Sequence, residues 1–383
     1  MNNYQEVVNF IKSLYPNHNP VPLHAPVFIG REKEYLNDCI DSTFVSYKGK
    51  YVTKFEKITA EFIGAKYAVA VVNGTAALQI ALQIAGVKPG DEVITQPLTF
   101  VATANAIIHC GAKPVFVDVD LDTMGMSPEK LNDWLSKNTK YNQSTNQTIN
   151  QSSGKAISAI VPMHTFGFPC MIDEIIEVAN KYNIPVIEDA AESLGSFYKG
   201  KHTGTFGLAG ILSYNGNKTI TTGGGGMIIS DNEGFAKKAK HITTTAKLPH
   251  KWEYIHDEVG YNYRLTNVTA AIGVAQMENL ESILINKRET AKLYSEFFKN
   301  FEIKFIKEQP DTKANNWLNC IQLKNREERD KFLEETNSDG VMTRPIWRLM
   351  NKLDMYKNCQ AGNIDNAEWL EDRVVNIPSG YRI

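Results

Sequence analysis

Short runs rich in β-forming residues alternate with longer helical patterns between Tyr67 and Ser230, and this alternation constrains the fold more than any other feature of the chain. The predicted strands cover residues 68–72, 92–95, 114–119, 157–163, 185–188, 210–213 and 227–230, with helical stretches such as 76–85 and 172–182 between them. Strands that alternate with helices form βαβ units, so we expect an α/β fold with a mostly parallel seven-stranded sheet covered on both faces. Ligands of such sheets bind beyond the carboxyl ends of the strands.

The pattern changes in the last third of the chain. A long helical pattern over residues 266–293 is followed by another over 323–335 and by a C-terminal part that contains Trp and Arg. We therefore expect an N-terminal extension (1–22), a large α/β domain (23–255) and a small C-terminal α+β domain (256–383). Residues 142–153 read NQSTNQTINQSS, a polar repeat that cannot bury a core, so a flexible surface insert is predicted at 138–155.

Composition excludes several classes of function. The formal charge is −2 and no basic patch occurs, so nucleic-acid binding has no support. The five cysteines stand singly without metal-ligand spacing, which is typical of reduced thiols and argues against a metal site. No apolar run approaches ~20 residues and no secretory signal is recognisable, so we expect a cytoplasmic protein that does not enter a membrane.

One lysine stands in a suggestive position. Lys218 ends the polar stretch SYNGNK, which begins at Ser213, and four glycines follow at residues 223–226. Such an amine can condense with an aldehyde while the serine and nearby backbone hold an anion, which is the Schiff-base chemistry of pyridoxal 5′-phosphate (PLP). Taken alone the stretch is weak evidence, because lysines beside glycines usually lie in ordinary loops.

Two further segments follow predicted strands. Asn73-Gly74-Thr75 precedes a helical pattern, where free N–H groups could meet a phosphate, or where the threonine could simply cap the helix. Asp189 follows a buried strand and could cap a helix, or pair with the pyridine nitrogen of a PLP ring.

Other residues have a structural interpretation beside a functional one. Phe100 could stack on a planar ring, although such a phenylalanine is more often core. His164 is more often a structural hydrogen-bonding residue than a catalyst. Asn262 belongs to a polar loop before a helix that Thr266 or Asn267 would cap.

Together and in this order, five motifs resemble the sugar-nucleotide aminotransferases of the fold-type I PLP superfamily, the superfamily of aspartate aminotransferase. The motifs are NGTAAL (73–78), TFVATANAI (99–107), EDAAESLGS (188–196), SYNGNK (213–218) and GYNYRLTN (260–267). The resemblance implies that Lys218 binds the cofactor covalently and moves the substrate proton, and that Asp189 holds the pyridinium. It also implies cofactor-binding roles for Gly74, Thr75 and Ser213 (phosphate), Phe100 (ring face), Glu192 (near the 3-hydroxyl) and Asn262 (phosphate of the neighbouring subunit, in a homodimer with shared active sites).

A finer resemblance is to the 4-aminotransferases of the legionaminic-acid and N-acetylbacillosamine pathways. It rests on residues 22–28, 244–265, 343–347 and 375–379, whereas Tyr47-Lys48-Gly49 departs from that branch. It implies that L-glutamate donates the amine, with pyridoxamine 5′-phosphate as intermediate. The acceptor would be a UDP- or GDP-linked 2-acetamido-4-keto-2,4,6-trideoxyhexose that serves bacterial surface glycans such as lipopolysaccharide O-antigen, or nonulosonic acids. Lys247, His250, Arg344 and Trp347 are candidate substrate-binding residues.

Several alternatives stay open. The acceptor could be another 4-keto-6-deoxy sugar nucleotide of the perosamine or dTDP-sugar type, a 3-keto sugar or an amino acid. The chain could also be a non-catalytic binding protein with a PLP fold. Lys218 disfavours the related sugar 3-dehydrases, which carry His there, and the lack of a GxGxxG motif after a predicted strand disfavours a dehydrogenase.

Overall fold

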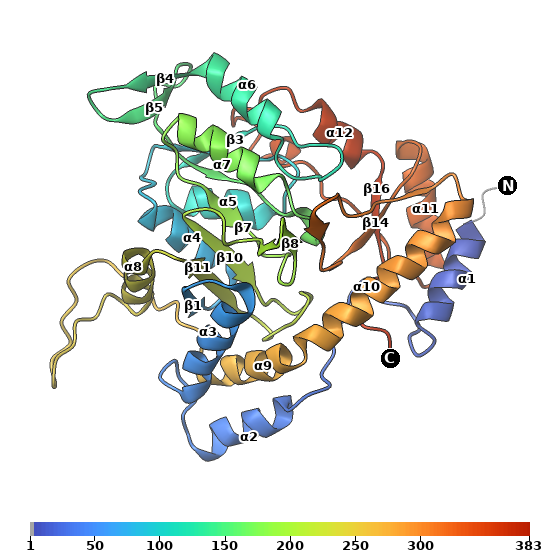
Figure 1. Ribbon diagram of the computed structural model, residues 1–383, viewed down its shortest axis with the longest axis horizontal. Coiled ribbons are helices and arrows are strands. Elements are labelled where there is room, and N and C mark those ends of the chain that lie inside the picture. The colour runs from blue at the N-terminus through green and yellow to red at the C-terminus, as the bar shows by residue number, and fades with distance from the viewer. Residues whose placement is uncertain (1–3) are drawn as a thin grey trace.

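The computed structural model describes residues 4–383, and a seven-stranded sheet lies at its centre (Figure 1). A four-stranded part and a three-stranded part are joined by bridges from Ile160 to Val186 and from Met163 to Asp189. In order, the strands are β1 (Tyr67–Val71), β11 (Gly226–Ser230), β10 (Ala209–Ser213), β7 (Ile187–Asp189), β6 (Ile157–Val161), β2 (Glu92–Thr95) and β3 (Lys113–Phe116). Among these seven only β11 runs antiparallel to its neighbours. Each predicted strand overlaps one of them, so the mostly parallel sheet is confirmed.

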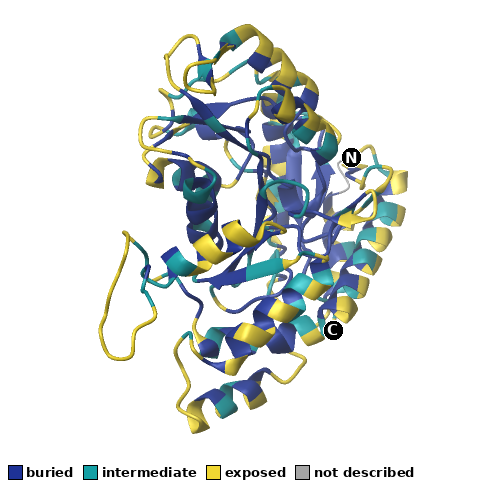
Figure 2. Ribbon diagram, turned by 60° about the vertical axis from the view of Figure 1, so that its left-hand side comes forward, coloured by how far each residue is buried: buried dark blue, intermediate teal, exposed yellow. Residues whose placement is uncertain are grey.

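Helices cover both faces of this sheet because alternate strand residues point to opposite sides. Val69 and Val71 of β1 pack against one helical layer, whereas Ala70 packs against the other. The first layer contains α4 (Gly74–Ile84), α5 (Val101–His109) and α8 (Glu233–Thr243). The second contains α2 (Glu32–Asp41), α3 (Lys50–Ile63) and α9 (Asn267–Glu278) beside β1, β11 and β10, and α6 (Pro128–Asn138) and α7 (Ile172–Lys181) beside β6, β2 and β3. Figure 2 shows the strands buried and the outer helix faces exposed.

A second, antiparallel sheet is built from the C-terminal part of the chain. Its order is β12 (Lys304–Phe305), β14 (Asn319–Gln322), β16 (Val374–Ile377) and β15 (Arg344–Pro345). It shares a core with α10 (Leu280–Phe297), α11 (Arg326–Ser338) and the N-terminal α1 (Tyr4–Leu14). The α+β character of this region agrees with the sequence, and the domain boundaries stay predictions. Within residues 4–383 no helix combines the length and apolarity that a membrane crossing requires.

The remaining elements are short. They are the strands β8 (Phe197–Tyr198), β9 (Lys201–His202) and β13 (Thr312–Lys313), which form a small sheet, the helix α12 (Asp365–Glu371), and the 3₁₀ turns η1 (Thr165–Gly167), η2 (Phe298–Asn300) and η3 (Met350–Lys352).

The long helical pattern predicted at 266–293 is confirmed, and the structure divides it into two helices, α9 and α10. Thr266 caps α9 as expected, by accepting a hydrogen bond from the amide of Thr269. The helix then breaks at Asn279, whose side chain donates back to the carbonyl of Ala275 at 2.9 Å. Such a side-chain bond competes with the helical backbone pattern, so α10 starts as a separate helix. The pattern at 323–335 begins later than predicted, because Asn325 caps α11.

The polar segment 142–153 was predicted to be a flexible loop, and this prediction is wrong. It lies in a β-hairpin formed by β4 (Thr139–Asn142) and β5 (Gln147–Asn150). Asn150 is fully buried and donates to the Glu92 carboxylate at 2.7 Å and to the side-chain oxygen of Gln360 at 2.6 Å. The composition of this segment does not reveal the hairpin, because Glu92 and Gln360, the partners of Asn150, are distant in sequence.

Asn150→Ala should therefore destabilise the protein. The substitution leaves the buried Glu92 carboxylate without this donor, which costs about 1–3 kcal/mol. The urea midpoint should fall accordingly, whereas Thr145→Ala at the exposed hairpin turn should leave it unchanged. Equal midpoints for the two variants would show that the hairpin is not anchored in this way.

Candidate active site

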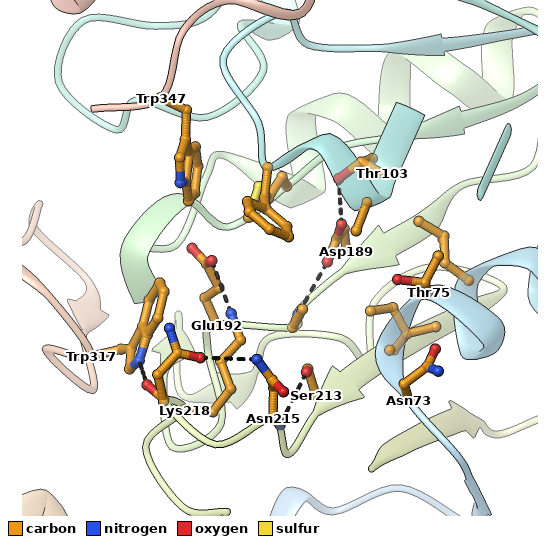
Figure 3. A pocket seen from close by; sticks show the side chains of 18 residues that line it. Asn73, Thr75, Thr103, Asp189, Glu192, Ser213, Asn215, Lys218, Trp317 and Trp347 are labelled. Carbon is orange, nitrogen blue, oxygen red and sulfur yellow. Dashed lines mark hydrogen bonds and ion pairs between the residues drawn. The ribbon is translucent and has the colours of Figure 1, made fainter. Parts of the chain in front are cut away.

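A cavity of about 310 Å³ lies at the carboxyl ends of β7 and β10, where the sequence placed the ligand site (Figure 3). It brings together residues from seven separate segments of the chain. The predicted site residues that line it are Gly74, Thr75, Phe100, Asp189, Glu192, Ser213, Lys218 and Trp347.

Lys218 presents its amine to this cavity from the loop after β10. Its Nζ lies 3.0 Å from Oε1 of Glu192 and 4.0 Å from the centre of the Trp317 ring. The side chain is only 12% exposed, and Figure 3 shows it between the carboxylate and the indole. Lys218 thus forms an ion pair with Glu192 and a cation–π contact with Trp317.

Asp189 is a buried carboxylate without a cationic partner. Its Oδ2 accepts a hydrogen bond from the Thr103 hydroxyl at 2.7 Å, and its Oδ1 accepts one from the amide of Ala191 at 3.2 Å. Among residues 4–383 no lysine, arginine or histidine nitrogen lies within 4.0 Å of it. Burial raises the pKa of Asp189, and the hydrogen bonds from Thr103 and Ala191 together with the more distant charges of Lys218 and His164 offset the loss of hydration only in part. A cation placed in the cavity would supply the missing partner.

The start of α4 forms another wall of the cavity. Asn73, and not the threonine that we weighed as a cap, accepts the hydrogen bond from the amide of Ala76 at 2.8 Å. The other N–H groups of the first turn have no acceptor within the helix, and the helix dipole favours an anion there. A Cβ added to Gly74 would lie only 3.1 Å from Cβ of Ser213, so glycine lets the two segments approach closely.

Glu192 lies between Lys218 and the backbone of Phe166. One carboxylate oxygen contacts Lys218 Nζ, and the other accepts the amide of Phe166 at 2.9 Å. Burial raises the pKa of Glu192 to about 7, and the charge of Lys218 only partly opposes this effect. The pair can therefore hold a proton near neutral pH.

Glu192→Gln should make the stability of the cofactor-free protein less dependent on pH. In the folded protein the pKa of Glu192, about 7, exceeds its ordinary value of about 4.5. The contribution of Glu192 to stability is therefore complete below pH 4.5 and is lost as the pH rises through 7. Glutamine does not titrate, so the variant should gain on the order of 2–3 kcal/mol relative to the original protein between pH 5 and pH 8. Thermal unfolding across this range measures the change, and a constant difference in Tm would contradict it.

Aromatic side chains surround the open part of the cavity. Phe100 is 49% exposed and is not a core residue, and its ring centre lies 6.1 Å from that of Trp347. Trp347 in turn packs on Phe166 with ring centres 4.5 Å apart. Phe100 thus offers a free face for a flat ligand.

Four predicted residues lie away from this cavity. Asn262 is exposed and follows the segment after α8, which carries Lys247 and His250 and extends away from the rest of the chain in Figure 1. Lys247 lies over the ring of Tyr254 at 3.8 Å. Arg344 is exposed and donates to the side-chain oxygen of Asn337 at 2.9 Å. Their assigned roles stay predictions.

His164 is buried outside the cavity. Its Nε2 lies 3.0 Å from Glu188, and its Nδ1 accepts the amide of Cys170 at 3.2 Å. Both ring nitrogens make structural contacts, as predicted by the interpretation of His164 as a structural hydrogen-bonding residue.

Thr103 and Trp317 contact the key groups of the site and were not predicted from the sequence. Thr103 lies within a quoted motif, and its place in the first turn of a helix after a strand could have identified it. Trp317 has no local signal, because it reaches Lys218 from a segment about a hundred residues further along the chain.

These features fit PLP. Asp189 has no cationic partner, and a pyridinium nitrogen would supply one. The first turn of α4 offers N–H groups to a phosphate. Lys218 supplies a primary amine, and Phe100 supplies a ring face.

The fold is shared with a solved aminotransferase structure. The structure superimposes on that of a DegT DnrJ EryC1 StrS aminotransferase from Brucella abortus with a TM-score of 0.82 and 25% identity, over 91% of this chain and 90% of the other. The fold and the site thus define a PLP-dependent aminotransferase of fold-type I. Residues 28–383 match the DegT/DnrJ/EryC1/StrS aminotransferase family, and the chain belongs to it.

Two relatives are similar over nearly their whole length. The GDP-perosamine synthase of Escherichia coli O157:H7 is 39% identical over 360 residues, which cover 94% of this chain and 93% of the relative. The GDP-perosamine synthase of Vibrio cholerae is 35% identical over 364 residues, which cover 94% of each chain. Both relatives place this protein among the sugar-nucleotide aminotransferases.

Proposed function

We propose that this protein transfers the amino group of L-glutamate to C4 of a nucleotide-linked 4-keto-6-deoxyhexose, for use in bacterial surface glycans or nonulosonic acids. One observation carries the proposal. The primary amine of Lys218 and the carboxylate of Asp189, which has no cationic partner, line the same cavity.

Each residue has a definite task in this reaction. PLP, when bound, supplies an electron sink for the carbanion that forms at the substrate carbon. Lys218 would take the proton from Cα of the donor and pass it to the cofactor, and in the second half-reaction it would move a proton from the cofactor to C4 of the sugar. Glu192 accepts a hydrogen bond from the amine of Lys218. Asp189 balances the positive charge of the ring nitrogen.

Two sugars are candidate acceptors. The motifs at 22–28, 244–265, 343–347 and 375–379 favour a UDP- or GDP-linked 2-acetamido-4-keto-2,4,6-trideoxyhexose. The two relatives named as GDP-perosamine synthases favour a GDP-linked 4-keto-6-deoxyhexose of the perosamine type. The two acceptors share the 4-keto group and differ at C2.

We further propose a homodimer with shared active sites. The segment after α8 exposes Trp252, Tyr254 and Val259, which is unusual for a surface in contact only with water. Asn262 follows this segment, so a partner subunit would receive it together with Lys247 and His250.

The five unpaired cysteines support a cytoplasmic location.

Absorbance spectroscopy tests the proposal. The purified protein with PLP receives L-glutamate and then, in separate samples, each GDP- and UDP-linked 4-keto sugar. A cofactor band that glutamate bleaches and that one sugar restores would support both half-reactions and identify the acceptor. A band that no donor changes would favour the non-catalytic alternative, and restoration only by a 3-keto sugar or a 2-oxo acid would overturn the sugar assignment.

A further inference from the structure

Lys287 is a buried lysine that the proposed reaction does not use. It lies on α10 with 1% of its side chain exposed. Among residues 4–383 no carboxylate lies within 4.0 Å of its amine, and burial lowers the pKa of Lys287 to about 7. A buried lysine amine destabilises the fold unless it is hydrogen-bonded.

The amine of Lys287 holds three separate segments together. It lies 3.0 Å from Nε2 of His24, and it donates to the carbonyl of Trp317 at 3.2 Å and to the carbonyl of Ser379 at 2.6 Å. A lysine ammonium has three N–H donors, and these three acceptors match that number. We call this arrangement the Lys287 clamp.

One of the clamped segments reaches the active site. The indole of Trp317 lies 4.0 Å from Nζ of Lys218, and its Nε1 donates to the carbonyl of Asn217 at 2.6 Å. The position of this ring depends on the backbone of Trp317, which Lys287 holds through the carbonyl. Trp317 therefore connects the Lys287 clamp to Lys218, the residue whose amine performs the chemistry.

We propose that Lys287 is a positioning residue that fixes Trp317 over Lys218. It acts through the backbone of Trp317 and does not touch the cavity itself. The proposal is independent of the sugar that the enzyme accepts and rests on the proposed function only for L-glutamate as donor.

A double-mutant cycle tests the proposal. Lys287→Met keeps the length of the side chain and removes the donors, and Trp317→Leu removes the ring. In single turnover with L-glutamate, Lys287→Met should lower the rate about tenfold when Trp317 is present and less than twofold when it is replaced. Lys292→Met, an exposed lysine on the same helix, is the matched control and should have no effect in either background.

A second readout needs no substrate. The centre of the Trp317 ring lies 4.0 Å from Nζ of Lys218, so loss of the ring should shift the pH midpoint of the bound cofactor's absorbance. Lys287→Met should give the same shift as Trp317→Leu, and the double variant should give no further shift. A failure of glutamate as donor would leave this titration informative.

Additive rate losses, or an unchanged absorbance midpoint in Lys287→Met, would overturn the proposal. If Lys287→Met does not fold, as judged by circular dichroism, Lys287→Leu replaces it in both measurements because it also removes every donor of the clamp. Coupling between Lys287→Leu and Trp317→Leu would then support the clamp, and additive effects would refute it.

Discussion

Lys218→Ala should abolish transamination while the protein stays folded. The substitution removes the only lysine amine that lines the cavity of the described chain, so both cofactor attachment and proton transfer are lost, and turnover should fall by at least about 10⁴-fold. Folding should survive because Glu192, whose pKa is already about 7, can become neutral once its partner is gone. Single-turnover kinetics and thermal unfolding measure the two effects.

The matched control for this variant is Lys201→Ala. Lys201 is an exposed lysine on β9, and its loss should leave turnover unchanged. Near-normal activity in Lys218→Ala would mean that a different group binds the cofactor, and the assignment of the site would fail.

Asp189→Asn should separate activity from stability. Asparagine has nearly the same shape but cannot balance a charge on the cofactor ring, so turnover should fall about 10²–10³-fold. The cofactor-free protein should be at least as stable as the original at pH 8, because burial raises the pKa of Asp189 and its ionised form becomes costly as the pH rises. Kinetics with saturating PLP and thermal unfolding of the cofactor-free protein test both outcomes.

Asp122→Asn, an exposed carboxylate, serves as the control and should change neither quantity. A purely structural Asp189 would give the opposite pattern, with a large loss of stability in the cofactor-free protein and a loss of activity that follows it.

The parts of this protein that were predictable from sequence are those with local causes. Strand alternation identified the central sheet because each strand carries its own apolar pattern. Asp189 and Ser213 could be located because both stand at the carboxyl end of a strand, where ligands of α/β sheets bind.

The errors and omissions have long-range causes. The hairpin around Asn150 depends on Glu92 and Gln360, which no local composition reveals. Trp317 and Lys287 act across segments that only the folded chain brings together. The break at Asn279 depends on a single side-chain bond within a continuous apolar pattern.

Among residues 4–383, the strands of the two parts of the central sheet are joined by the bridges between the β6 and β7 segments, and the active-site cavity lies at that seam. The residues that line the cavity run from Asn73 to Trp347, and contacts between segments so far apart in sequence form slowly, so the cavity is completed late in folding. A cofactor that binds only the completed cavity draws the equilibrium toward the native chain by mass action. PLP supplied during synthesis should therefore act as a folding aid and raise the yield of variants with weakened cores.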